Sequence, residues 1–201
     1  MSKGIDIKFV QERYQRMPDD QLIRIATQEA YGLTPEAINV VKAEIQKRGL
    51  DSNIASGVDA QNKTYTTEEV DLYCNIISIL SCPLCGKKTE RLNGTMIVEV
   101  MSFVIFTSYD KKIRVACPQC LDNLNNRAMR KSAIFGWWGL PWGFIRTPQA
   151  IRLNLDSKST NHLNGPNEYL REFTISVIGE IETYKDNEDK LDEILKRRNR
   201  E

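Results

Sequence analysis

The chain has 201 residues, of which 41% are hydrophobic and 27% charged, a composition that excludes a disordered or a fibrous protein. Its 28 lysines and arginines nearly balance 27 acidic residues, so a net charge of +1 excludes a polycation that coats nucleic acid along its whole length. The single histidine, His162, excludes a histidine-rich metal site, and its polar surroundings in the sequence predict a surface residue.

Residues 1–50 predict a helical hairpin. Apolar side chains recur at helical spacing over residues 19–31, and Thr34 followed by Pro35 is typical of the N-cap and first position of a second helix. Such a hairpin resembles a DNA-reading helix-turn-helix in outline. However, Glu36 lies at the start of the second helix, where DNA phosphates would be contacted, so a packing or docking module is the favoured interpretation.

The amino-acid composition changes twice in the middle of the chain. Residues 51–64 are small and polar and predict a linker. Residues 65–125 predict a zinc ribbon. Within them, the Val-, Ile-, Met- and Phe-rich stretch 95–109 predicts a strand or a hairpin pair, and residues 113–116 predict another short strand. Residues 121–135 then predict a helix.

Two Cys-x-x-Cys pairs, Cys82 with Cys85 and Cys117 with Cys120, are the strongest chemical signal in the chain. Two intervening residues let a tight turn direct both sulfurs at one ion, and Gly86 suits the positive φ that follows such a turn. Four thiolates match tetrahedral Zn²⁺ without an open position, which predicts one structural zinc ion. The alternatives are four unrelated thiols, a dithiol redox pair and an iron–sulfur centre.

The fifth cysteine, Cys74, is expected to be a small buried residue and not a ligand. The first residues of the chain lack the apolar core of a secretory signal, so paired cysteines indicate metal ligation in the cytoplasm and not a disulfide scaffold. The longest charge-free apolar stretch, residues 132–145, has 14 residues, whereas an ordinary spanning helix needs about 20.

Residues 126–153 form a segment rich in tryptophan and glycine. Its glycines and Pro141 predict a turn, and Thr147 with Pro148 predicts the restart of a short helix. We expect the segment to pack against the ribbon with one side left for binding. The alternative is docking on an anionic membrane, peripheral to it, since basic residues flank the tryptophans. The candidate interaction surface comprises Trp137, Trp138, Trp142, Arg127, Arg130, Lys131 and Arg146.

The two Cys-Pro-x-Cys knuckles resemble those of a zinc ribbon. The run GWWGLPWG at residues 136–143, continuing through RTPQAI, resembles a segment of uncharacterised bacterial zinc-ribbon proteins, where it often lies close to or within membrane-associated hydrophobic sequence. Residues 17–50 resemble short helical modules common in bacterial proteins. These resemblances imply metal binding but no particular function, since ribbons occur in transcription, translation and scaffolding proteins.

Together these patterns predict an α+β protein: a helical hairpin, a central four-cysteine zinc ribbon, a tryptophan-rich turn, and a polar loop and C-terminal helix over residues 154–201. No activated nucleophile or acid–base pair stands out, so we expect a non-catalytic adaptor or scaffold that binds a protein partner through the ribbon and the tryptophan-rich segment. Residues 110–153 contain eight basic residues against two acidic ones. This surplus leaves nucleic-acid-binding regulation as the first alternative and peripheral membrane association as the second.

Overall fold

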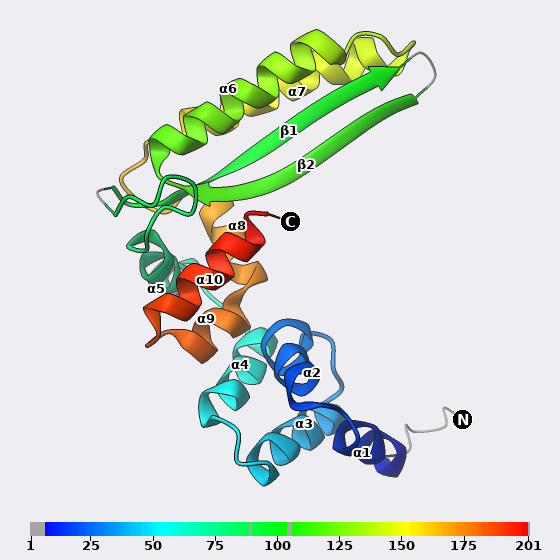
Figure 1. The fold of residues 1–201 in the computed structure, drawn as a ribbon, viewed down its shortest axis with the longest axis vertical. Helices are drawn as coiled ribbons and strands as arrows, with labels where there is room; N and C mark the ends of the chain where they lie inside the picture. The colour runs from blue at the N-terminus through cyan, green and yellow to red at the C-terminus, as the bar shows by residue number, and fades with distance from the viewer. Residues whose placement is uncertain (1–6, 89, 104–105, 201) are drawn as a thin grey trace. The chain divides into compact units, whose positions relative to one another are not determined.

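The computed structural model describes residues 7–88, 90–103 and 106–200, and combines helices with a two-stranded antiparallel sheet (Figure 1). This mixture agrees with the α+β class expected from the sequence. The chain divides into two compact units. Unit 1 consists of the described residues up to Thr66 together with Val177–Leu191, and unit 2 consists of Thr67–Ser176 together with the described residues from Asp192 onward.

Unit 1 is helical. Its elements are α1 (Ile7–Gln15), α2 (Asp19–Arg24), the π-helical segment η1 (Ile25–Glu29), α3 (Pro35–Lys47), α4 (Ser52–Asn62), α9 (Ile178–Tyr184) and the first part of α10 (Glu188–Arg198). The predicted start of the second helix is confirmed, because the Thr34 side chain accepts a hydrogen bond from the Ala37 N–H and Pro35 is the first helical residue. The core is built from apolar side chains at helical spacing, among them Leu22, Ala26, Val41, Ile45, Ile54 and Val58.

Arg48, just after α3, ties this helix to the end of α1. Its Nη1 donates to the Met17 carbonyl at 2.7 Å and its Nη2 to the Tyr14 carbonyl at 2.8 Å. The same guanidinium pairs with Asp19 at 2.7 Å and with Glu44 at 2.8 Å. Because helix C-termini leave carbonyls without donors, one planar guanidinium here replaces several missing N–H groups.

The linker expected at residues 51–64 is wrong, because this stretch forms α4. Asp51 caps the helix by accepting from the Asn53 N–H, and Ile54 is buried in the core of unit 1. Small residues are needed where α4 crosses α9, since a Cβ on Gly57 would lie 2.7 Å from the Gly179 carbonyl oxygen. A composition that looks like a linker therefore serves close helix packing.

Unit 2 contains a long hairpin with helices along it. Its elements are α5 (Thr67–Ser78), β1 (Asn93–Phe103), β2 (Phe106–Ala116), α6 (Pro118–Phe135), α7 (Trp142–Ser159), α8 (Glu168–Ser176) and the end of α10. The strands pair in register from Asn93 opposite Ala116 to Phe103 opposite Phe106, so residues 113–116 are the end of β2 and not a separate strand. Helices α6 and α7 run along this hairpin (Figure 1). We call β1, β2, α6 and α7 the arm.

Polar side chains from α6, α7 and the residue before α8 cover the edge of β1 that faces away from β2. From Gly94 to Val100, every second residue has a backbone group bonded in this way: Gly94 to Asn167, Met96 to Asn125, Val98 to Asn154 and Val100 to Ser132. Asn154 is fully buried, and its amide both donates to the Val98 carbonyl at 2.7 Å and accepts from the Val98 N–H at 3.2 Å. The amides thus take the place of a third strand, which removes an exposed edge.

Two expectations for the C-terminal third are wrong. Helix α7 starts at Trp142 and continues through Pro148 to Ser159, so it neither restarts at residue 147 nor ends before residue 154, the expected start of a polar loop. The carbonyl that loses its helical donor to Pro148 belongs to Phe144, a residue that is exposed to solvent. The tail is not one helix but three, α8, α9 and α10, divided between the two units.

Candidate metal centre

The four cysteines predicted as metal ligands lie together in unit 2. The Sγ atoms of Cys82, Cys85, Cys117 and Cys120 are all within 4.8 Å of one another. The Sγ atoms of Cys85 and Cys117 are 3.8 Å apart. A tetrahedron with metal–sulfur bonds of about 2.3 Å has edges of about 3.8 Å, so the spacing suits one ion at the centre of the four sulfurs.

The first pair lies in a turn between α5 and β1. The Gly86 N–H donates to the Cys82 carbonyl at 2.8 Å, and the Cys82 N–H donates to the Lys87 carbonyl at 2.9 Å. These bonds fold the chain back sharply, and Gly86 accordingly has a φ of +71°, which a residue with a Cβ rarely adopts. The prediction that Gly86 adopts a positive φ after the first cysteine pair is thereby confirmed.

The second pair lies at the junction of β2 and α6. Cys117 follows the strand and precedes Pro118, the first residue of α6, and Cys120 lies in the first helical turn. This second pair follows a strand, whereas the first pair follows α5. The long interval between the pairs is explained by the hairpin, because β1 and β2 carry the chain out along the arm and return it to the first pair.

The protonation of the thiols depends on their surroundings. Burial raises the pKa of the Cys117 and Cys120 thiols, and the neighbouring sulfurs raise that of Cys120 further. Burial also acts on Cys82, but backbone N–H donors, chiefly those of Cys117 and Cys85, outweigh it and lower its pKa to about 7. The Cys117 N–H lies 3.4 Å from the Cys82 sulfur. Four thiols this close can all ionise only around a cation, so metal binding here releases protons.

Two other residues singled out in the sequence lie outside this cluster. Cys74 on α5 is fully buried, as predicted, and is hydrogen-bonded to the Thr174 hydroxyl at 3.3 Å. The exposed His162 ring is a surface group, also as predicted, with its Nε2 3.3 Å from the Asp122 carboxylate. Neither residue is among the four donors.

The tryptophan-rich segment packs on the hairpin through its glycines and leaves its rings outside. A Cβ on Gly139 would lie 2.6 Å from the Thr107 hydroxyl oxygen, which shows how closely this turn approaches β2. Trp137, Trp138 and Trp142 are nevertheless exposed, Trp138 by 70%. Within the described part of the chain, no helix combines the length and apolarity needed to cross a bilayer.

The basic residues of the candidate surface have different environments. Lys131 forms an ion pair with Glu99, and the Arg146 guanidinium lies 5.0 Å from the centre of the Tyr109 ring. Arg127 and Arg130 are exposed on α6. The sequence could count these charges but could not assign their neighbours on other elements.

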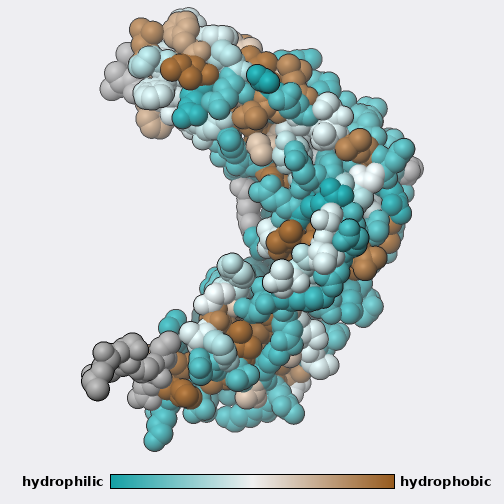
Figure 2. Space-filling model, turned by 180° about the vertical axis from the view of Figure 1, so that it is seen from behind, coloured by the Kyte–Doolittle hydropathy of each residue, from teal (hydrophilic) through white to brown (hydrophobic). Residues whose placement is uncertain are grey.

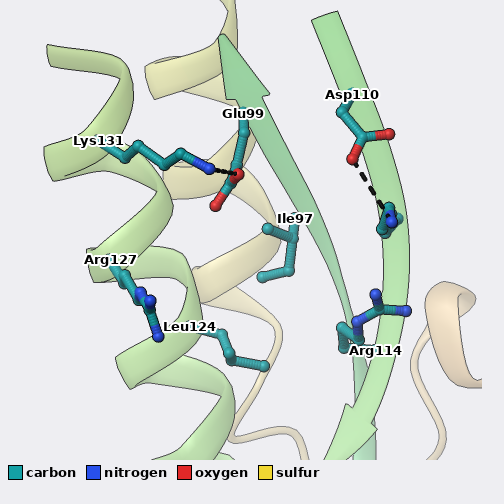
Figure 3. Close-up of a pocket in the computed structure, with 8 residues that line it drawn as sticks. Ile97, Glu99, Asp110, Arg114, Leu124, Arg127 and Lys131 are labelled. Carbon is teal, nitrogen blue, oxygen red and sulfur yellow. Dashed lines mark hydrogen bonds and ion pairs between the residues drawn. The ribbon is translucent and has the colours of Figure 1, made fainter. Parts of the chain in front are cut away.

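A pocket of about 300 Å³ lies between α6 and the strands (Figure 3). It is lined by Ile97, Glu99, Asp110, Lys112, Arg114, Leu124, Arg127 and Lys131. Four of these side chains are basic and two acidic. Glu99 pairs with Lys131 and Asp110 lies 3.7 Å from Lys112, so basic side chains outnumber acidic ones in this pocket. Sequence reasoning found the basic surplus but not this pocket.

The cysteine cluster offers four sulfur donors and no oxygen or nitrogen donor. Such a set prefers soft or borderline ions over Mg²⁺ or Ca²⁺. Four protein ligands also complete a tetrahedral shell, so the centre has no coordination position for water or substrate. Comparison of the chain with protein-family models, with curated proteins and with solved structures found no match.

Proposed function

We propose that this protein is a non-catalytic adaptor, in which one structural Zn²⁺ ion holds the base of the arm and the arm presents a docking surface at its far end. The observation that carries the proposal is the grouping of four cysteine sulfurs within 4.8 Å. A closed four-thiolate shell serves the fold, since catalytic zinc keeps a position open.

The spacing of the sulfurs favours a single ion. An iron–sulfur cluster places several iron and sulfide atoms between its cysteines, and sulfurs within 4.8 Å leave space for one ion only. Between zinc and a lone iron, zinc is the common occupant of a structural four-cysteine site. The identity of the metal is therefore the first measurement to make.

The proposed ion joins four chain positions: the turn after α5, the approach to β1, the end of β2 and the start of α6. Because the unfolded chain has no preformed site, the free energy of metal binding contributes to folding, by up to about 10 kcal/mol. Removal of the metal would therefore break the proposed link between these four positions at the base of the hairpin. The proposed adaptor thus depends on a metal ion that stabilises the fold and does not bind a substrate.

Elemental analysis of protein purified without chelators tests the proposal, with one zinc per chain expected. Cys85→Ser should lose the metal, and because Cys85 is exposed the change leaves no cavity. Cys74→Ser is the matched control, since serine can keep the hydrogen bond to Thr174 and should leave the zinc content unchanged. Iron, or no metal in freshly purified protein, would contradict the zinc assignment.

The basic pocket favours nucleic-acid binding as a second candidate function, because four basic side chains against two acidic ones suit phosphate groups. Zinc-loaded full-length chain titrated with duplex and single-stranded oligonucleotides tests it. Binding that weakens with salt and is reduced by Arg127→Gln, but not by Arg24→Gln in unit 1, would promote this candidate. Absence of saturable binding in moderate salt would remove it.

A further inference from the structure

The far end of the arm concentrates exposed apolar side chains. Ten of the nineteen large hydrophobic residues that are exposed among the described residues lie here: Phe103, Phe106, Ile134, Phe135, Trp137, Trp138, Leu140, Trp142, Phe144 and Ile145. We call this set the apolar end. Figure 2 shows apolar side chains gathered at that end of the arm. Scattered exposed hydrophobics are normal, but a concentration of this kind marks an interaction site.

The apolar end is assembled from both layers of the arm. The hairpin supplies Phe103 and Phe106, and the end of α6, the start of α7 and the connection between them supply the other eight residues. The two parts touch, because a Cβ on Gly139 would lie 2.9 Å from the Ser102 Cβ, next to Phe103. The apolar end therefore draws on both the strands and the helices of the arm.

The indole N–H groups of Trp137 and Trp138 already have hydrogen-bond partners within the protein. The Trp137 Nε1–H donates to the Ala133 carbonyl at 2.9 Å, and the Trp138 Nε1–H donates to the Ile134 carbonyl at 3.0 Å. A polar group that enters an apolar medium without a partner carries a large free-energy penalty. Since both donors are already satisfied within α6 and its C-terminal turn, the rings can leave water without that penalty.

Cations lie directly behind the apolar end. Residues 132–145 carry no charge, and from 123 to 155 the chain has five basic residues and no acidic one. Arg130 lies five residues before Phe135 on α6, about 8 Å along the helix. Arg146 stacks on Tyr109, which lies three residues beyond Phe106, about 10 Å along the strand. Two nearby acids, Glu99 and Asp110, are paired with Lys131 and Lys112.

We propose that the apolar end inserts into the interface of a membrane that contains anionic lipids, with Arg130 and Arg146 at the headgroups. The inference rests on the proposed function, since it names what the docking surface of the adaptor binds. Interfacial segments bury their apolar groups about 5–10 Å deep, which matches the distance from the apolar end to these cations. Exposed apolar side chains at the end of the arm, with indoles among them and cations next to them, are the combination that an anionic lipid interface binds.

Tryptophan fluorescence reports on this end without a label, because all three tryptophans of the chain belong to it. The zinc-loaded full-length protein is mixed with vesicles of phosphatidylcholine, with and without phosphatidylglycerol. The expected result is a blue shift of the emission and co-sedimentation with the anionic vesicles, both weakened by salt. Equal binding to both kinds of vesicle would overturn the assigned role of the arginines.

Two kinds of variant separate the apolar and the electrostatic parts. Leu140→Ser removes a side chain that is 75% exposed and should weaken vesicle binding about tenfold. Leu72→Ser, at a residue on α5 that is 67% exposed, is the matched control and should leave binding unchanged. Arg130→Gln should weaken binding about fivefold, the equivalent of about 1 kcal/mol. Zinc content confirms that each variant is folded.

Other outcomes contradict the inference or the proposed function separately. Zinc-loaded protein that neither shifts its emission nor sediments overturns membrane docking and leaves the adaptor proposal in place. A blue shift that grows with protein concentration in the absence of vesicles identifies a second copy of the chain as the occupant and also overturns it. Protein that binds vesicles through Leu140 but contains no zinc overturns the metal proposal alone.

Discussion

Asn154 provides the sharpest test of how the arm is held together. Its side chain is fully buried and satisfies both the N–H and the C=O of Val98 on the edge of β1. Asn154→Leu keeps a side chain of similar size, so it leaves little cavity. It removes both hydrogen bonds and leaves two buried backbone groups without a partner.

Each buried group left unpaired destabilises the fold by about 1–3 kcal/mol, so the two groups of Val98 together predict a loss of about 2–6 kcal/mol. Loss of the weaker contact from the Asn125 amide, 3.3 Å from the Asn154 oxygen, adds to it. A protein of ordinary stability unfolds with only about 5–15 kcal/mol, so the variant should be close to the limit of folding.

Urea denaturation of the zinc-loaded protein, followed by tryptophan fluorescence, measures the loss. All tryptophans are in unit 2, so the signal follows the arm and not unit 1. Asn123→Leu replaces an exposed asparagine on α6 and should change the free energy of unfolding by less than about 0.5 kcal/mol. A loss below about 1 kcal/mol for Asn154→Leu, or equal losses for both variants, would refute the role assigned to the edge amides.

Three further changes test other contacts. Two hydrogen bonds from Arg171 lower the pKa of Asp71 below its ordinary 3.8, so their stabilisation is complete above that pH and lost as the pH falls through the lower folded value. Asp71→Asn should therefore flatten the acid side of the pH–stability profile and destabilise by up to about 1 kcal/mol at pH 7. Gly94→Ala places a Cβ 2.3 Å from the backbone of α8 and should lower the free energy of unfolding by about 1–3 kcal/mol in urea. Arg48→Lys keeps the charge but loses the planar fork that reaches several carbonyls of α1, so the thermal midpoint of unit 1 should fall, as measured by circular dichroism.

Two of these changes have a matched comparison. Gly165→Ala should be neutral, because nothing lies within 4 Å of its added Cβ. Arg13→Lys, at an exposed residue of α1, should leave the midpoint of unit 1 unchanged. An unaltered acid profile for Asp71→Asn would show that the pair with Arg171 contributes nothing to stability.

Local signals in the sequence predicted local structure well. Thr34 and Pro35 place the start of α3 because capping involves only neighbouring residues. The two cysteine pairs likewise predicted which four side chains meet, since each knuckle is a short turn. That the bound ion is zinc stays a prediction until it is measured.

What the sequence could not predict depends on residues far apart in the chain. Asn154 and Val98 are 56 residues apart, and no pattern near either one reveals that an amide completes the edge of a strand. The small residues of α4 are explained only by α9, which contributes Gly179 more than a hundred positions later. Thr147 with Pro148 predicted a helix start, whereas Pro148 lies inside α7, where the carbonyl without a helical donor belongs to the exposed residue Phe144.

The division of the chain also has a consequence for the order of folding during synthesis. Unit 1 needs Val177–Leu191, and these residues leave the ribosome only after the hairpin and its helices have been made. Until α9 has been synthesised, the small residues of α4 around Gly57 have no helix packed against them. We therefore expect the arm to fold first and the amino-terminal unit last, the reverse of the usual vectorial order in which domains nearer the N-terminus fold first.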